Sequence, residues 1–224
     1  MKNIRERIDF VKNEIEKAKQ RSGRKDDVKL IAVTKTVGVD RIREAYEYGC
    51  EALGENRVQE MMEKFDSFPD ADWQLIGHLQ KNKAKYVVGK AKLIHSVDSI
   101  ELLREINRIA EKKGIVQDVL LEVNISGEIT KYGLTTDQIQ DIIIKIGELG
   151  HILVRGIMTM APKSENPEDI RWVFKEAKKL FDSLKKTNDK FDTLSMGMSS
   201  DFAVAVEEGA TMVRVGSLIF GERI

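Results

Sequence analysis

The sequence predicts an α/β protein, a single (β/α)8 TIM barrel over residues 1–224 with an additional N-terminal helix. Short apolar runs, typical of buried strands, alternate along the whole chain with helical segments. This strict alternation indicates parallel strands, because parallel neighbours need a helical crossover between them. The length of 224 residues is close to the ~250 usual for eight such units. No Gly-, Ser- or Pro-rich linker marks a domain boundary, so a single domain is expected. An open doubly wound sheet is the structural alternative to the barrel.

In the first part of the chain, residues 1–21 predict a helix with one apolar face: Ile4, Ile8, Val11, Ile15 and Ala18. The next strands are expected at 28–34, 51–54 and 73–76, and helices at 40–49, 55–66 and 80–88. Asp40 is the expected N-cap of the first of these three helices, and Gly49 is its expected end.

The second part repeats this pattern with clearer helix signals. Strands are expected at 93–95, 115–124, 152–158, 193–196 and 211–215. Asp98-x-x-Glu101 is interpreted as a capping box that opens a helix ending before Gly114, and Thr135-x-x-Gln138 as another, with Gly150 as the end of its helix. A long helix begins at Pro167, because proline is favoured at the first helical position. A last helix is expected at about 200–208.

Composition excludes several classes of protein. Lys+Arg and Asp+Glu both number 37, so a nucleic-acid partner is not expected, and the lysines between Lys81 and Lys92 are interpreted as a solvated helix face. Cys50 is the single cysteine, which excludes an intrachain disulfide, and the three histidines have no metal-site spacing. No apolar run is long enough for a membrane span, and the N-terminus is charged throughout. We therefore expect a cytoplasmic monomer without metal or membrane partners.

Polar residues and glycines gather where the predicted strands end. A barrel carries its active site at the C-terminal ends of its strands, so these residues should share one mouth. They are Lys35, Glu55-Asn56, Gly77-His78, Ser96, Asn124, Met158-Thr159, Gly197 to Ser200, and Arg214 to Ser217. The pattern predicts a ligand pocket there.

Lys35 directly follows the apolar run that ends at Thr34. Desolvation at the rim of a barrel core disfavours the charged form of a lysine. A neutral amine is a nucleophile toward carbonyl groups and forms Schiff bases. The alternative is a lysine that extends into solvent or pairs with a carboxylate such as Glu55, and position alone does not decide between the two.

The last two strand ends are suited to a phosphate group. Ser199 and Ser200 precede a predicted helix, and Gly216-Ser217 adds an open backbone and a third hydroxyl. The loops after strands seven and eight commonly hold phosphate in such barrels. Ser199 as a plain helix cap and Gly216 as a tight turn are the structural alternatives. Arg214 has three candidate partners: the phosphate, Glu207 or Glu208, and a ring nitrogen.

A lysine able to form a Schiff base beside a phosphate site suggests pyridoxal 5′-phosphate as the cofactor. The sequence also resembles the pyridoxal phosphate homeostasis proteins (the YggS/PROSC family) over nearly its whole length. The matching stretches, in order, are Ala32–Thr36, Gly54–Glu60, Ile76–Lys83, Gly156–Met160, Met196–Asp201 and Val213–Gly221.

The resemblance implies roles for individual residues. It implies that Lys35 carries the Schiff base, that Ser199, Ser200, Gly216 and Ser217 hold the phosphate, and that Arg214 faces the pyridine nitrogen, as in the similar barrel of fold-type III alanine racemases. Asn56, His78 and Met158 lie in motifs that line the pocket, although His78 has the alternative of a core histidine bonded to a backbone carbonyl. The sequence departs from the family pattern at Gly38, Arg57 and Trp73-Gln74-Leu75. These differences bear on the expected pocket walls and surface contacts.

Arg214 at the ring nitrogen would leave that nitrogen unprotonated, which weakens the cofactor as an electron sink. A racemase also needs a second base, for which Lys131 and Tyr132 are the candidates in this sequence. We therefore hypothesise a carrier or buffer of the cofactor with little or no catalysis, serving vitamin B6 homeostasis, with pyridoxal-phosphate-dependent apoenzymes as candidate recipients. A weak racemase or lyase, and a barrel for another phosphorylated metabolite, are the alternatives.

Overall fold

The computed structural model describes residues 3–128 and 131–221. Its eight parallel strands form one closed barrel in sequence order, with β8 paired to β1. Their bounds are β1 (Lys29–Val33), β2 (Ala52–Glu55), β3 (Asp72–Leu75), β4 (Leu93–Val97), β5 (Gln117–Glu122), β6 (Ile152–Met158), β7 (Thr193–Ser195) and β8 (Met212–Val215). The predicted (β/α)8 barrel is confirmed, and closure through β1 and β8 excludes the open sheet.

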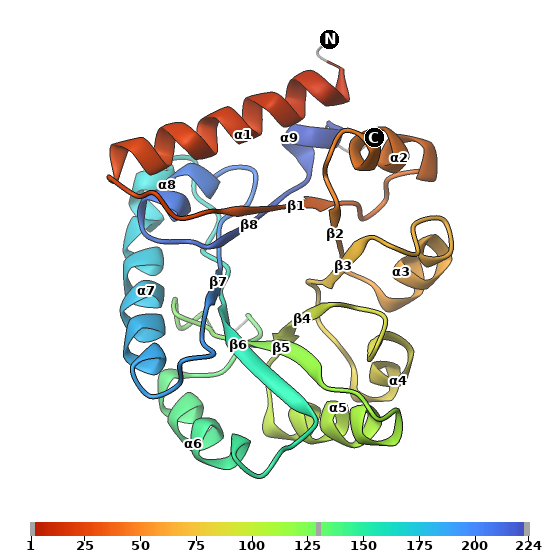
Figure 1. The fold of residues 1–224 in the computed structure, drawn as a ribbon. Helices are drawn as coiled ribbons and strands as arrows, with labels where there is room; N and C mark the ends of the chain where they lie inside the picture. Colours follow the sequence, from red (N-terminus) through yellow and green to blue (C-terminus); the bar gives the residue numbers. More distant parts are fainter. Residues whose placement is uncertain (1–2, 129–130, 222–224) are drawn as a thin grey trace.

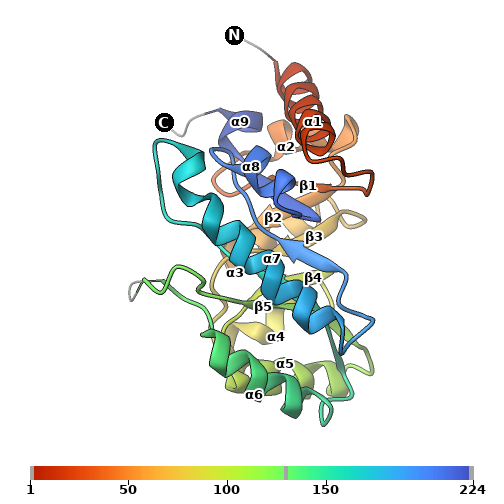
Figure 2. The ribbon, with the colours of Figure 1, turned by 90° about the vertical axis from the view of Figure 1, so that its left-hand side faces the viewer.

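Helices surround the barrel (Figure 1). They are α1 (Ile4–Arg21), α2 (Val39–Glu47), α3 (Val58–Phe65), a 3-10 turn η1 (Lys81–Lys83) leading into α4 (Ala84–Val87), α5 (Ile100–Lys112), α6 (Thr136–Ile146), η2 (Pro167–Ile170) leading into α7 (Arg171–Lys185), α8 (Phe202–Glu207) and α9 (Ser217–Phe220). Figure 2 shows α1 outside β1, beside α8 and α9. Among the described helices, none has the length and apolar character needed to cross a bilayer.

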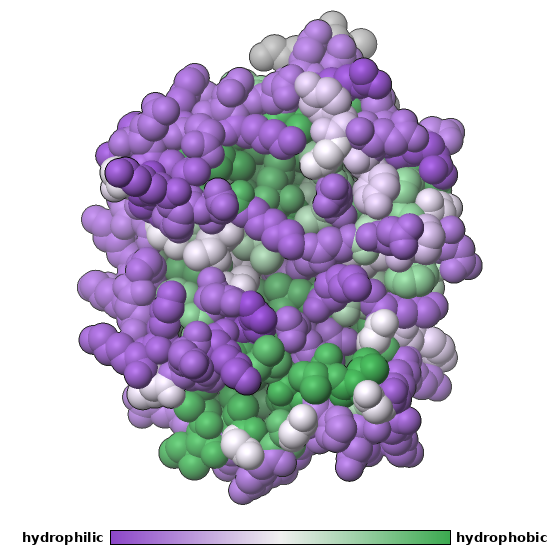
Figure 3. Space-filling model, in the orientation of Figure 1, coloured by the Kyte–Doolittle hydropathy of each residue, from purple (hydrophilic) through white to green (hydrophobic). Residues whose placement is uncertain are grey.

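The core has two layers. The larger lies between the strands and the helices, and it takes in the whole predicted apolar face of α1, which is buried. The smaller fills the barrel interior with residues from alternate strand positions: Ile31, Ala52, Leu93, Leu120, Met158 and Met212. Polar and charged side chains cover most of the outer surface seen in Figure 3, with an apolar area over the part where β5 and β6 lie. The interior layer supports the site from below.

Several predicted helix ends need correction. The N-cap of α2 is Gly38, not Asp40. Ser99, not Asp98, caps α5, because its hydroxyl accepts the Leu102 amide while the Asp98 carboxylate turns to a histidine. The capping box at Thr135 is confirmed, but α6 ends at Ile146, before Gly150. The sequence analysis also missed α9, which is a single turn.

Gly156 on β6 is a point where the barrel requires glycine. It has φ +151°, and a Cβ there would lie 1.9 Å from the backbone oxygen of Thr193 on the neighbouring β7. The register of β5 against β6 also shifts beside it, where Leu120 pairs with Gly156. The close approach of β6 and β7 therefore depends on the missing side chain.

We predict that Gly156→Ala lowers the free energy of unfolding by about 2–4 kcal/mol, because the added methyl forces β6 and β7 apart. Gly150→Ala is the matched control: its Cβ would meet nothing within 4 Å, so the change should be within about 0.5 kcal/mol. Urea denaturation followed by circular dichroism measures both. Equal stabilities of the two variants would contradict this account of Gly156.

Candidate functional site

A cavity of about 600 Å³ opens at the C-terminal ends of the strands. It brings together most of the predicted site residues: Lys35, Asn56, Ser199, Ser200, Arg214, Gly216 and Ser217. Its wall also contains Met160 and Lys163, which the sequence analysis missed. Met160 belongs to a matching stretch and stands two positions beyond Met158, so the period of a strand could have indicated it.

Lys35 follows β1 and is half-buried at the cavity wall. The carboxylate offered as its alternative partner is engaged elsewhere, since Glu55 Oε1 lies 2.8 Å from the Nζ of Lys64. Glu55 also accepts a 2.6 Å hydrogen bond from the Thr34 hydroxyl. Lys64, a buried cation on α3, was not recognised in the sequence, because an isolated lysine in a helix gives no signal of burial.

Two loops, 197–200 and 216–217, contribute another part of the cavity wall; we call them the serine loops. The amide of Gly216 donates a 3.2 Å hydrogen bond to the hydroxyl of Ser199 and so joins the two loops. Asp201 stands at the N-cap position of α8, so Ser199 is not its cap. A Cβ on Gly216 would lie 3.2 Å from both Cβ and O of Val33, so the second loop packs tightly against β1. Three hydroxyls thus line one side of the cavity.

Arg214 is buried below the serine loops. Its Nη1 donates to the hydroxyl of Ser195 at 2.6 Å, and its Nη2 donates to the backbone oxygen of Thr159 at 3.0 Å. Burial lowers the pKa of Arg214 to about 10, although the carboxylates of Asp201 and Glu122 oppose this. The alternative of a pair with Glu207 or Glu208 is wrong, because Arg171 binds both carboxylates at 2.6 Å.

From Arg214 an interior hydrogen-bond row crosses the barrel through Ser195, His95 and Gln74 to Asp72. His95 Nδ1 lies 3.1 Å from the Ser195 hydroxyl, and Nε2 lies 2.9 Å from Oε1 of Gln74. The Gln74 amide nitrogen then donates to Asp72 at 2.5 Å. This row was not predicted from the sequence, because its members are distributed over four strands that lie far apart along the chain.

Each member of this row donates a hydrogen bond to the next, from Arg214 to Asp72. Burial, with the positive charges of Arg214 and Lys29, lowers the pKa of His95 well below its usual value, so the ring is neutral. Because Gln74 presents an oxygen, Nε2 carries the proton, and Nδ1 accepts from the Ser195 hydroxyl. That leaves the Ser195 oxygen free to accept from Arg214. Every proton in the row is therefore assigned, and the guanidinium is fixed in orientation.

Two predicted site residues lie outside the cavity wall. Met158 is fully buried in the interior layer. His78 is 37% exposed, with Nδ1 3.2 Å from the Asp98 carboxylate, and its ring stacks on Tyr132 at 4.2 Å. The alternative of a core histidine at His78 is wrong; the buried histidine of the barrel is His95.

The two candidate second bases also lie outside the cavity wall. Tyr132 is 58% exposed and stacks on His78. The ammonium of Lys131 lies 3.3 Å from the carboxylate of Glu128. Neither candidate second base is therefore among the described residues that line the cavity.

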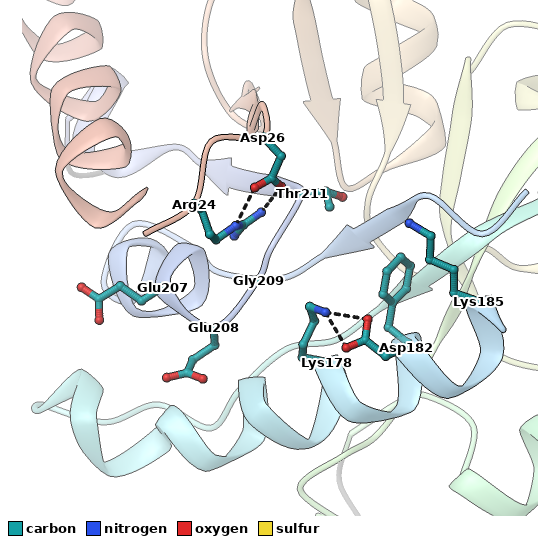
Figure 4. A pocket seen from close by; sticks show the side chains of 10 residues that line it. Arg24, Asp26, Lys178, Asp182, Lys185, Glu207, Glu208, Gly209 and Thr211 are labelled. Atoms are coloured by element: carbon teal, nitrogen blue, oxygen red, sulfur yellow. Dashed lines mark hydrogen bonds and ion pairs between the residues drawn. The ribbon is translucent and has the colours of Figure 1, made fainter. Parts of the chain in front are cut away.

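A second hollow of about 390 Å³ lies at the other end of the barrel, between α7 and the segments that enter β1 and β8 (Figure 4). Several of its charged side chains are paired with one another. Arg24 binds Asp26, and Lys178 binds both oxygens of Asp182 at 2.5 Å. This arrangement indicates a structural role, as is usual for that face of a barrel.

Comparison with known proteins places the chain in a family. The family model described as alanine racemase, N-terminal domain, matches residues 7–224. A protein of Aquifex aeolicus named pyridoxal phosphate homeostasis protein is 47% identical over 225 residues, which cover 99% of each sequence. This chain belongs to the pyridoxal phosphate homeostasis protein family.

Solved structures agree with this assignment. The structure of PipY from Synechococcus elongatus with pyridoxal phosphate bound is 35% identical, covers 98% of this chain and 100% of PipY, and has a TM-score of 0.83. An alanine racemase of Clostridium difficile shares the barrel fold alone: it is 18% identical, with a TM-score of 0.79, and the match covers 99% of this chain and 60% of the racemase. The barrel of this chain therefore corresponds in fold to 60% of the racemase chain.

Glu122, on β5, is a buried acid close to this site. Burial and the nearby Asp98 raise its pKa to about 7, against the opposing effect of Arg214. Between the ordinary value near 4.5 and 7, the folded protein thus binds a proton that the unfolded chain has lost. Stability must fall as pH rises through this window, because the carboxylate becomes charged inside the barrel.

We predict that Glu122→Gln removes this loss. The variant should match the wild type at pH 5 and exceed its free energy of unfolding by about 2–3 kcal/mol at pH 8, because glutamine stays neutral. Urea denaturation across pH 5–8 measures the difference. A constant difference over the whole range would show that the pKa of Glu122 is not raised in the folded state.

Proposed function

We propose that this protein binds pyridoxal 5′-phosphate in the cavity at the barrel mouth and serves vitamin B6 homeostasis within the cell as a carrier or buffer. The single observation that carries the proposal is one cavity lined by Lys35, the serine loops and Arg214. These three elements match the three reactive parts of the cofactor: aldehyde, phosphate and pyridine nitrogen. Membership of the family and the cofactor-bound PipY structure support it.

The residues fit the group in size and chemistry. A cavity of about 600 Å³ lies within the range of small-molecule sites. The hydroxyls of Ser199, Ser200 and Ser217 supply donors for phosphate oxygens, and the open backbone at Gly216 lets the ligand come close. Asn56, directly after β2, also lines the cavity wall. His78 and Met158 support the site from outside the wall, in our proposal, rather than by contact.

Lys35 supplies the covalent link. Lys35 would hold the aldehyde of the cofactor, since a lysine amine and an aldehyde condense reversibly to a Schiff base with loss of one water. Because Schiff-base formation and its hydrolysis are both accessible, such a site can hold the cofactor and also release it. Lys163 supplies a second amine at the same wall, but its side chain is exposed.

Arg214 limits what the site does chemically. It presents donors only, so a ring nitrogen facing it accepts and stays unprotonated. Because the interior hydrogen-bond row holds the guanidinium, this arrangement does not adapt to a ligand. A weak electron sink, with both candidate second bases, Lys131 and Tyr132, outside the cavity wall, favours binding over amino-acid chemistry. Release to pyridoxal-phosphate-dependent apoenzymes is the outcome we propose for the bound cofactor.

We predict that mixing the wild type with pyridoxal 5′-phosphate produces a yellow absorption band that Lys35→Ala abolishes. Borohydride reduction followed by peptide mapping should place the label on Lys35. Lys163→Ala is the matched control, since it removes the other lysine of the same wall and should retain the band. No band in the wild type would refute the cofactor assignment and favour another phosphorylated metabolite, and a label on Lys163 would refute the role of Lys35.

We also predict that the protein with bound cofactor removes the α-deuteron of labelled amino acids no faster than free pyridoxal 5′-phosphate does. The physical reason is an unprotonated ring nitrogen, together with the location of Lys131 and Tyr132, the two candidate second bases, outside the cavity wall. Proton NMR of deuterated alanine and other amino acids follows the exchange. A rate well above that of free cofactor, lost in Tyr132→Phe or Lys131→Ala, would establish the racemase or lyase alternative.

A further inference from the structure

Lys35 lies in a tight turn that depends on an unusual backbone conformation. The amide of Val37 donates to the carbonyl of Thr34 at 3.0 Å, which closes a four-residue turn with Lys35 in second place. The third residue, Thr36, has φ +62° and is the only non-glycine residue with positive φ among those described. A β-branched residue disfavours this region strongly, so surrounding contacts must hold the turn.

One buried cation supplies those contacts. The Nζ of Lys64, on α3, donates to the carbonyl oxygen of Thr34 at 2.8 Å. It also binds Oε1 of Glu55 at 2.8 Å and Oε1 of Glu60 at 2.7 Å. The same Oε1 of Glu60 accepts the amide of Thr36. We call Lys64, Glu55 and Glu60 the Lys64 clamp.

The clamp acts on both peptide groups that flank Lys35. The carbonyl of Thr34 belongs to the peptide group before the Lys35 Cα, and the amide of Thr36 belongs to the one after it. The backbone angles φ and ψ of Lys35 are the rotations between these two planes and the Cα. Holding one plane through Lys64 and the other through Glu60 therefore fixes both angles and the direction in which the Lys35 side chain leaves the backbone.

Stability alone is a weak explanation for this cluster. A buried ion pair adds little compared with well-packed apolar side chains of similar size. The Thr34 carbonyl already has the Val37 amide as a partner, so it does not need Lys64 for satisfaction. Moreover, Oε2 of Glu55 is buried without a hydrogen-bond partner among the described residues. The cluster is better explained by the position of the atoms it holds.

We propose that Lys64 is a positioning residue for Lys35, which sets the aim of the Lys35 amine into the cavity through the two flanking peptide groups. This inference rests on the proposed function only in one respect, that Lys35 binds pyridoxal 5′-phosphate. The clamp itself is a property of the protein without ligand. Glu60 serves in it as the link to Thr36, and Glu55 as the buried counter-ion.

Lys64→Met tests the proposal, because methionine keeps the length of the side chain and removes the donor. Without cofactor, amide hydrogen exchange in a peptide covering residues 34–38 should accelerate on the order of tenfold. With pyridoxal 5′-phosphate, borohydride trapping of Lys35 should slow by about tenfold or more, because the amine spends less time correctly aimed. Lys17→Met, an exposed lysine on α1, is the control and should change neither rate.

Two further variants separate positioning from folding. If Lys64→Met leaves too little folded protein, the same two rates are measured on Lys64→Met/Glu55→Gln, which also removes the uncompensated carboxylate. Thr36→Gly in the Lys64→Met background should recover part of the trapping rate, about threefold, because glycine adopts positive φ freely. A merely structural role of Lys64 predicts no such rescue.

The outcomes also distinguish this proposal from the proposed function. If the wild type is not trapped by pyridoxal 5′-phosphate at all, the function fails, while the exchange experiment still decides the clamp. If a folded Lys64→Met protein exchanges residues 34–38 and is trapped at Lys35 at wild-type rates, the clamp is refuted and the function is unaffected.

Discussion

The buried charge of Arg214 is the constraint on which the rest of the site depends. A guanidinium inside a barrel must have acceptors for its protons, because burial without them would be too unfavourable. Ser195 and the Thr159 carbonyl supply them, and the need to satisfy Ser195 in turn fixes the tautomer of His95 and the orientation of Gln74. One charge thereby dictates polar side chains on three other strands, β7, β4 and β3.

This polar row interrupts an otherwise apolar barrel interior. Leu93, Leu120, Met158 and Met212 fill the interior layer beside it, and they exclude the water that would otherwise hydrate the row. Exclusion of water strengthens the hydrogen bonds of Arg214 and also raises the pKa of Glu122. The same low polarity that fixes the guanidinium thus makes a neighbouring carboxylate sensitive to pH. Rigidity at the site and pH-dependent stability have one physical origin.

The two sides of the cavity are held by different means. On the β7–β8 side, backbone contacts dominate, since the serine loops are joined through Gly216 and packed against Val33. On the β1 side, a single ammonium on α3 holds the turn that presents Lys35. Backbone contacts give the serine loops their shape. The turn that contains Lys35 depends instead on an ion cluster between α3 and β2. The site is therefore built from both ends of the sequence and closed by β1 pairing with β8.

The sequence by itself determined the barrel, because the apolar periods of strands and helices, and their alternation, are local properties of neighbouring residues. It also predicted that Lys35, the serine loops and Arg214 share one mouth, since each follows or ends a strand, and the structure places them around one cavity. Only the tertiary structure decided the rest. That His95, rather than His78, is the buried histidine, that Asp98 pairs with His78, and that Lys64 reaches Thr34 all depend on contacts between distant segments. Such contacts leave no periodic trace, because one side chain meeting another across the barrel requires no regular spacing between them.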